Sequence, residues 1–241
     1  SSDLYKQLFA DPTFQLVFKN TIEFTLACLV VQFTIGFLFA MFFSKKFTLA
    51  GPIRGLVLVG YMMPMSVTAL LGKNLFLLDG GVINDLLMKV HLISSPIDWL
   101  VNGGTALGAV IAVNCWVGIP FNMLLLTSGL TGISTDIYES ASMDGANAFK
   151  RFIYITLPLM KPAMLSVLML GFIYTFKAFD LMYIMTAGGP FNSTDVLGTY
   201  AYSKAFTQYE FSQGSAIAMV LFACLFLVGI FYLKLLSKED D

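Results

Sequence analysis

Residues 22–43 read IEFTLACLVVQFTIGFLFAMFF, and Glu23 is the only charged side chain among them. A helix rises about 1.5 Å per residue, so roughly twenty apolar residues cross the hydrocarbon core of a bilayer. Four more apolar stretches are long enough to do so, at residues 55–72, 105–130, 162–185 and 214–236. They lack the alternating pattern of a membrane barrel, so we predict an all-α polytopic membrane protein with five transmembrane helices.

The composition supports the membrane class and excludes others. The 241 residues are 57% hydrophobic and 12% charged, whereas soluble domains carry about 25% charged residues. Lysine plus arginine number 14 against 15 acidic residues, so there is no basic excess for a nucleic-acid partner. The three cysteines lie within apolar runs, where we expect them to pack. His91 is the single histidine, so we expect no metal site.

Two of the predicted spans contain an interior proline. Pro64 and Pro120 each remove a backbone donor and are expected to kink or break their helices. A break within the membrane frees backbone groups, which is tolerated where they line a cavity.

The distribution of lysine and arginine predicts the orientation. Lysine and arginine are more frequent in residues 44–54, in residues 131–161 and at the C-terminus than in the alternating segments. We therefore place these three segments in the cytoplasm. Five spans then leave the N-terminus outside, and this predicts a sixth, N-terminal helix that is missing from the chain. Residues 73–104 and 186–213 become outer-face interfacial loops. The first is expected to form short amphipathic helices with Trp99 at headgroup level, an ordinary loop being the alternative.

Residues 131–158, TGISTDIYESASMDGANAFKRFIYITLP, carry the most specific local pattern. Asp136, three residues before Glu139, resembles a capping box that opens a helix. Apolar Ile137, Ala141 and Met143 give this helix a second face, and Gly145 predicts its end. Such a helix either docks a partner or lies at the membrane interface, and the pattern alone leaves both open.

The same segment resembles the signature of binding-protein-dependent ABC permeases, which begins with Glu-Ala-Ala. The matching positions are Glu139-Ser140-Ala141, Gly145, Ile155 and Leu157-Pro158, with Ser140 in place of the usual alanine. Similarity to the maltose-type sugar permease family extends to Asn20-Thr21, Asn114-x-Trp116-x-Gly118, Phe179-Asp180-Leu181-Met182-Tyr183, Thr186-Ala187-Gly188-Gly189-Pro190 and Thr194. These motifs stand in register along nearly the whole chain.

This resemblance implies a type I ABC importer permease fold, with residues 1–241 as a single transmembrane permease domain. Residues 131–158 would then hold the coupling helix, which inserts into a cleft of the ATPase. The coupling residues implied are Ile137, Glu139, Ala141, Asp144 and Gly145. No Walker-type Gly-x-x-x-x-Gly-Lys-Ser/Thr occurs in the sequence. We therefore expect no enzymatic activity and no cofactor in this chain, with ATP and Mg bound by partner subunits.

Two charges interrupt the fourth predicted span. A charge at the bilayer centre costs about 2.5–3.5 kcal/mol on insertion scales, so Lys177 and Asp180 need water or partners. Spaced to share a helical face, they predict either a polar transport cavity or a structural ion pair. The resemblance implies that a sugar is contacted by Asn114, Val117, Gly118, Phe121, Phe176, Lys177 and Asp180.

The resulting hypothesis is the permease subunit of an ATP-driven carbohydrate importer in a bacterial or archaeal plasma membrane. Its partners would be a second permease in a heterodimer, two ATPase subunits, a periplasmic or extracellular solute-binding protein and membrane lipid. The alternative is an ion-coupled secondary transporter that uses Lys177 and Asp180, although the sequence shows no convincing repeated halves. A membrane enzyme lacks a catalytic cluster. The sequence does not separate one sugar or polyol from another.

Overall fold

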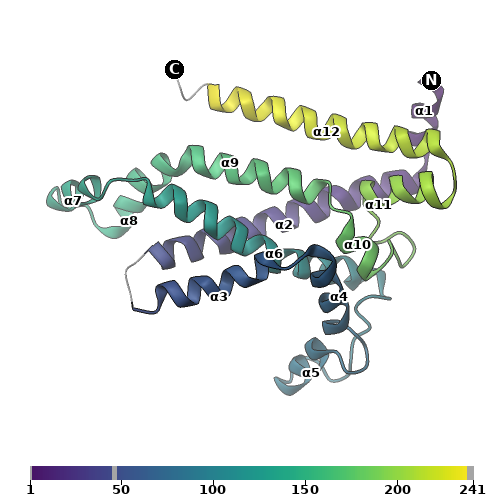
Figure 1. Cartoon of the computed structure of the whole chain (residues 1–241), viewed down its shortest axis with the longest axis horizontal. Coiled ribbons are helices and arrows are strands. Elements are labelled where there is room, and N and C mark those ends of the chain that lie inside the picture. Colours follow the sequence, from purple (N-terminus) through teal and green to yellow (C-terminus); the bar gives the residue numbers. More distant parts are fainter. Residues whose placement is uncertain (1, 45–47, 238–241) are drawn as a thin grey trace. The chain divides into compact units, whose positions relative to one another are not determined.

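The computed structural model describes residues 2–44 and 48–237, and the elements in these ranges are helices (Figure 1). In chain order they are α1 (Ser2–Ala10), α2 (Pro12–Ser44), α3 (Ala50–Met62), α4 (Met65–Leu75), α5 (Val82–Lys89), α6 (Gly103–Thr131), α7 (Thr135–Met143), α8 (Ala148–Arg151), the π-helix η1 (Phe152–Thr156), α9 (Leu157–Phe176), α10 (Asp180–Met185), α11 (Leu197–Tyr202), the π-helix η2 (Ser203–Thr207) and α12 (Phe211–Ser237). The all-α prediction is confirmed.

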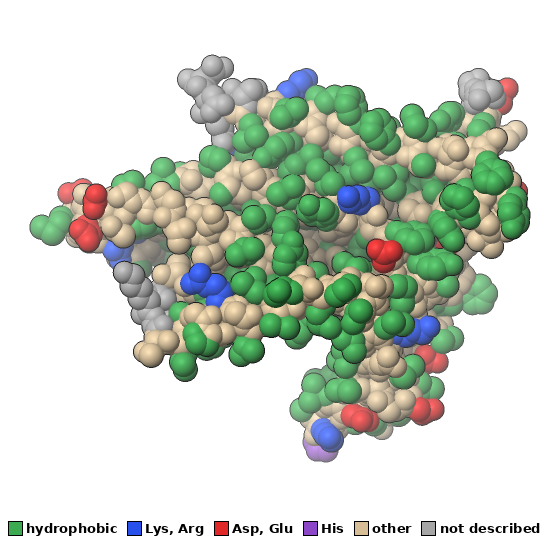
Figure 2. Space-filling model, viewed as in Figure 1, with side chains coloured by type: hydrophobic (Ala, Val, Ile, Leu, Met, Phe, Trp, Pro, Cys, Tyr) green, Lys and Arg blue, Asp and Glu red, His purple; other side chains and the backbone are tan. Residues whose placement is uncertain are grey.

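Within residues 2–44 and 48–237, four continuous helices are long and apolar enough to span a membrane. They are α2, α6, the helix Ala148–Phe176 and α12, and the bent pair α3–α4 makes up to five. Hydrophobic side chains cover α12 and α3 in Figure 2, as expected for helices that face lipid. The predicted fourth span differs from the structure, because the helix begins at Ala148 and ends at Phe176. A hydropathy run does not record where a helix stops.

The two interior prolines behave differently. At Pro64 the chain bends by 97° between α3 and α4, as predicted, and Pro64 adopts the extended ψ of 140° that precedes α4. Pro120, in contrast, lies inside the unbroken helix α6, so the expected break is absent there. The Asn122 side-chain amide donates to the Gly118 carbonyl at 2.8 Å, which provides an additional hydrogen bond in this turn.

The chain divides into two compact units. The first contains residues 1–28, 63–115 and 173–227, and the second contains residues 29–62, 116–172 and 228–241.

In the first unit, α10 packs against α4, and the segment after α10 is tied to α2. The Asn20 amide donates to the carbonyls of Asn192 (2.8 Å) and Asp195 (3.1 Å), and the Leu197 backbone N–H donates to the Thr21 hydroxyl at 3.0 Å. Asn20 and Thr21 are buried. They therefore satisfy the backbone of a non-helical segment that is distant in sequence.

Asp195 is a buried carboxylate at the centre of this segment. The Thr199 hydroxyl donates to its Oδ1 at 2.7 Å, and the backbone of Gly188, at a φ of +83°, passes so close that a Cβ there would overlap the carboxylate. Burial raises the pKa of Asp195 above its ordinary 3.8, and the Thr199 hydrogen bond offsets part of that rise.

Residues 73–104 begin with the end of α4 and contain one short amphipathic helix, α5, followed by an irregular stretch. Buried Asn84 organises both parts. Its amide donates to the Ile97 carbonyl at 2.9 Å, and the Trp99 indole N–H donates to its Oδ1 at 2.8 Å. The structure thus contains one of the expected short amphipathic helices, and the Trp99 indole is bound to it; the position of Trp99 at headgroup level stays a prediction.

In the second unit, small residues allow helices to approach closely. A Cβ on Gly36 would lie 2.6 Å from the Cβ of Asn122, and a Cβ on Gly129 would lie 2.7 Å from that of Ala163. Buried Phe37, Ala40, Leu126, Met160 and Val167 form the adjoining core. Close backbone contact of this kind is the usual basis of helix association in membranes.

We predict that Gly36→Ala lowers the stability of the protein. The new methyl would overlap the Cβ of Asn122, an atom fixed to the backbone, and overpacking of this kind costs about 1–3 kcal/mol. Thermal unfolding of the detergent-purified protein measures the effect. Gly55→Ala on α3 is the matched control, because nothing lies within 4 Å of a Cβ there. Equal melting temperatures for both variants would contradict the close crossing.

A second prediction concerns the pH dependence set by Asp195. Because its pKa is raised on folding, its contribution to stability is present below 3.8 and is lost as pH rises through the folded pKa. In Asp195→Asn, the amide oxygen still accepts from Thr199 and does not titrate. The stability of the variant relative to the natural protein should therefore increase with pH above 3.8 and then level off. A pH-independent difference in melting temperature would show that Asp195 is not desolvated.

Candidate functional site

The helix predicted from residues 131–158 is α7, and it begins one residue before Asp136. Its N-cap is Ser134, whose hydroxyl accepts from the Asp136 backbone N–H at 3.3 Å. The predicted capping box led by Asp136 is therefore wrong. Ser134 has the extended ψ of an N-cap, and Asp136 instead lies in the first turn, where its charge complements the helix dipole.

The predicted end of the helix is confirmed. Gly145 has a φ of +79°, and its N–H donates to the Ser142 carbonyl at 3.1 Å. The Ala146 N–H donates to the Ala141 carbonyl at 2.9 Å, which completes a Schellman motif after Asp144, the C-cap. Glycine adopts this left-handed conformation at low cost, so the chain turns back sharply after Met143.

Helices α7 and α8 form a hairpin beyond the ends of α6 and α9 (Figure 1). None of the α7 side chains is buried. Met143 is 89% exposed and Phe149 on α8 is 70% exposed, while Ile137 and Glu139 are also exposed. Most of the predicted coupling residues thus lie on an accessible surface that carries unusually large apolar side chains.

The other side of α7 is bonded to the start of the neighbouring span. The Tyr138 hydroxyl lies 3.0 Å from the Thr156 hydroxyl, and the Arg151 guanidinium donates to the Ser142 hydroxyl at 2.6 Å. A cavity of about 550 Å³ lies beside this contact, between residues of α2, α6, α7 and η1. Helix α7 is therefore anchored to the helix that continues into α9.

Lys177 and Asp180 lie at the break between α9 and α10 and not on one helix. Among the described residues, no ion pair joins them. The Lys177 ammonium instead lies 5.3 Å from the centre of the Tyr174 ring. Both charged side chains are exposed, whereas neighbouring Phe176 is fully buried. Asp180 occupies the first turn of α10, where an acidic residue is favourable.

The other predicted substrate residues lie on α6. Asn114 belongs to the first unit and is buried, while Val117, Gly118 and Phe121 belong to the second. Gly118 packs against the side chain of buried Gln32, and the Phe121 ring centre lies 5.6 Å from that of Tyr61. Lys177 and Asp180 are thus the most accessible polar members of the predicted set.

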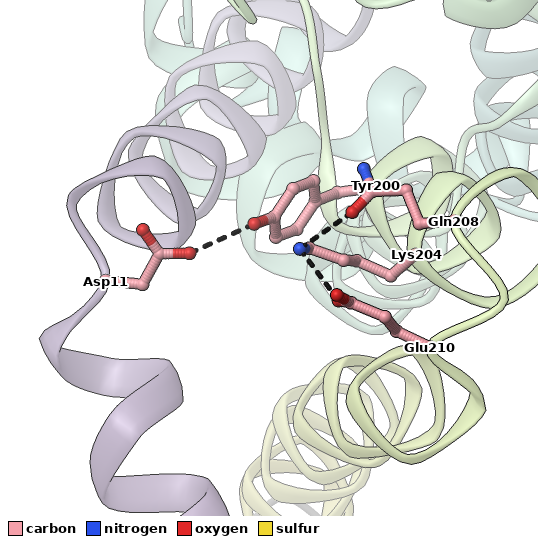
Figure 3. Close-up of polar contacts among 5 residues, drawn as sticks. All are labelled: Asp11, Tyr200, Lys204, Gln208 and Glu210. Atoms are coloured by element: carbon pink, nitrogen blue, oxygen red, sulfur yellow. Dashed lines mark hydrogen bonds and ion pairs between the residues drawn. The ribbon is translucent and has the colours of Figure 1, made fainter.

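Sequence reasoning missed a polar cluster between α1, α2, α11 and η2 (Figure 3). The hydroxyl of buried Tyr200 donates to the Asp11 carboxylate at 3.0 Å. The pKa of Tyr200 is raised, mainly because the side chain is buried and secondly because the Asp11 carboxylate is close. The Lys204 ammonium donates to Gln208 (2.9 Å) and Glu210 (3.0 Å). A cavity of about 250 Å³ beside the cluster is lined by Leu4, Gln7, Leu8, Asp11, Lys204 and Gln213. The i,i+4 spacing of Lys204 and Gln208 is its only sequence signal.

Known proteins resemble this chain over nearly its whole length. The sulfoquinovosyl glycerol transport system permease protein of Agrobacterium fabrum is 31% identical over 236 residues, which cover 98% of this chain and 76% of that protein. The trehalose/maltose transport system permease protein of Thermococcus litoralis is 31% identical over 214 residues, covering 89% and 72%.

Solved structures support the same fold. A bacterial ABC transporter that imports the acidic polysaccharide alginate superposes with a TM-score of 0.88 at 19% identity, covering 99% of this chain and 84% of that one. The alginate transporter in complex with an alginate pentasaccharide-bound periplasmic protein gives a TM-score of 0.85 at 20% identity, covering 95% and 80%. Residues 32–238 match the family of binding-protein-dependent transport system inner membrane components, and the chain therefore belongs to this family of ABC importer permeases.

Proposed function

We propose that this chain forms half of the translocation path of an ATP-driven carbohydrate importer and passes the movement of an ATPase subunit to its membrane helices by alternating access. The observation that carries the proposal is α7, a short helix with an exposed apolar side and an anchored inner side. The proposed assembly contains a second permease, two ATPase subunits that bind ATP and Mg, and a solute-binding protein. It resides in a bacterial or archaeal plasma membrane with the C-terminus in the cytoplasm.

The exposed side of α7 supports the coupling role. Met143 and Phe149 place large apolar side chains in solvent at an energetic cost that a docked partner would remove. Glu139 lies on the same short helix and supplies a carboxylate for a basic group of the partner. Predicted coupling residues Asp144 and Gly145 shape the turn that ends this surface.

The carbohydrate assignment is supported by the relatives and by the exposed charges. The relatives named above transport trehalose or maltose, sulfoquinovosyl glycerol, and alginate. Lys177 and Asp180 offer charge-assisted hydrogen bonds to sugar hydroxyls. We assign Asn114, Val117, Gly118, Phe121 and Phe176 to shaping the path, with the buried members acting through packing.

We predict that Met143→Asp weakens retention of the ATPase. A charge within an apolar docking surface is expected to cost about 1.4 kcal/mol or more, which corresponds to about a tenfold or greater loss of affinity. The tagged chain, coexpressed with its genomic neighbours, is purified in mild detergent, and the bound ATPase is quantified. Met143→Leu keeps the apolar surface and is the matched control, while Glu139→Lys should weaken binding in the same way. An undiminished ATPase yield in both Met143→Asp and Glu139→Lys would contradict the docking role.

We also predict that Asp180→Ala abolishes uptake without disassembling the complex. Loss of a hydrogen bond to a charged group costs about 1.5–3 kcal/mol, or about a ten- to hundredfold loss of binding. Uptake into proteoliposomes is measured with labelled maltose, trehalose, sulfoquinovosyl glycerol and alginate oligosaccharides. Asp79→Ala, which removes an exposed aspartate from the loop before α5, is the control. Collapse of the complex in Asp180→Ala would mean that the carboxylate is structural.

A further inference from the structure

Five aromatic rings of the first unit form a continuous series, which we call the aromatic row. Its members, in spatial order, are Phe179, Tyr183, Tyr202, Phe206 and Phe211. The ring centres of Phe179 and Tyr183 are 5.1 Å apart, and Tyr202 lies 5.2 Å from Phe179 and 5.4 Å from Tyr183. Phe206 follows 5.2 Å from Tyr202, and Phe211 lies 6.4 Å beyond it. Three separate segments supply these rings.

Most of the row is accessible. Four of the five residues are exposed. Their exposed fractions lie between 37% at Tyr202 and 60% at Phe206, and the other two are Tyr183 and Phe211. Rings of this size usually bury most of their surface, so a connected exposed series indicates a surface for contact.

Charged residues adjoin the row in sequence at both of its ends. Phe179 is the N-cap of α10 and directly precedes exposed Asp180. At the other end, Glu210 lies between Phe206 and Phe211 in the sequence and directly precedes Phe211. Its carboxylate accepts a hydrogen bond from the Lys204 ammonium. Two tyrosine hydroxyls lie within the row itself. Aromatic belts at membrane interfaces also combine rings, hydroxyls and charges, but they do not require rings from three separate segments to contact one another in series.

This combination suits a pyranose ring. The C–H face of a sugar packs against an aromatic face, while its hydroxyls bind phenol, carboxylate and ammonium groups at the edges. Successive equivalent rings offer several weak sites in place of one tight site, which permits movement along a path. We propose that the aromatic row is a carbohydrate-binding surface that guides sugar rings between the Lys204–Glu210 end and Asp180. The inference rests on the proposed function.

Tyr202 is the residue of choice for a test, because it contacts three other rings. Tyr202→Leu keeps apolar volume and removes the flat ring, and Tyr202→Phe restores the ring without the hydroxyl. Phe222→Leu is the matched control, because Phe222 is exposed and stacks on Phe226 at 5.9 Å outside the row. Uptake by the complete reconstituted complex is measured with the panel saccharide that the natural complex transports, and rates are normalised to the recovered complex.

For Tyr202→Leu we expect kcat/KM for uptake to fall about two- to tenfold, mainly through KM. Tyr202→Phe should recover most of the loss, and Phe222→Leu should match the natural complex. As a second measurement, Tyr202→Cys in a Cys224→Ser background is labelled with an impermeant maleimide, and the same saccharide should slow this labelling.

The outcomes separate the inference from the function on which it rests. If the natural complex transports no saccharide of the panel, the carbohydrate assignment fails and the row proposal falls with it. In a second outcome, the natural complex transports a saccharide that the Tyr202→Leu complex transports equally well, while this saccharide does not slow maleimide labelling of the Tyr202→Cys variant. This pair of results would overturn the row proposal and leave the carbohydrate assignment intact. In a third outcome, Tyr202→Leu lowers the yield of assembled complex while the uptake rate per complex stays unchanged. This result would overturn the row proposal, because the Tyr202 ring would then serve assembly of the complex.

Discussion

Every backbone polar group in an apolar environment needs a partner, and this constraint determines where the chain can leave its helices. The segment after α10 is the clearest case. Asn20 and Thr21 of α2 bind its backbone, and Thr194 donates to the Gly189 carbonyl at 2.8 Å. With these bonds in place, the chain reverses direction and brings α11 to its position beside Asp11.

The same constraint gives several of the motif residues a role in the fold. Asn20, Thr21 and Thr194 are buried and occupied by hydrogen bonds, and Gly188 leaves room for the Asp195 carboxylate. These residues hold the segment that presents Tyr202 and its neighbours. The exposed rings of the aromatic row thus depend for their position on a buried polar framework.

The sequence predicted the helical class, four of the five spans, the bend at Pro64 and the end of α7 at Gly145, because each depends on local properties. It did not predict the continuous helix through Pro120 or the helix break at residues 177–179. The segment that follows this break is tied to Asn20, which precedes its bonding partner Asn192 by 172 residues, a separation that no local pattern records. The aromatic row was missed for the same reason, since the contact between residues 179 and 202 exists only after the intervening chain has folded back.

The two sides of α7 are under separate constraints. Tyr138, Ser142, Arg151 and Thr156 form a closed set of bonds within the chain, so a change at one requires compensation by another. Met143 and Phe149 point into solvent and take no part in this set. If α7 docks a partner as proposed, the exposed residues are free to follow changes in that partner while the anchor stays constant. A helix of nine residues can thus keep a fixed attachment to its own chain on one side while its other side varies.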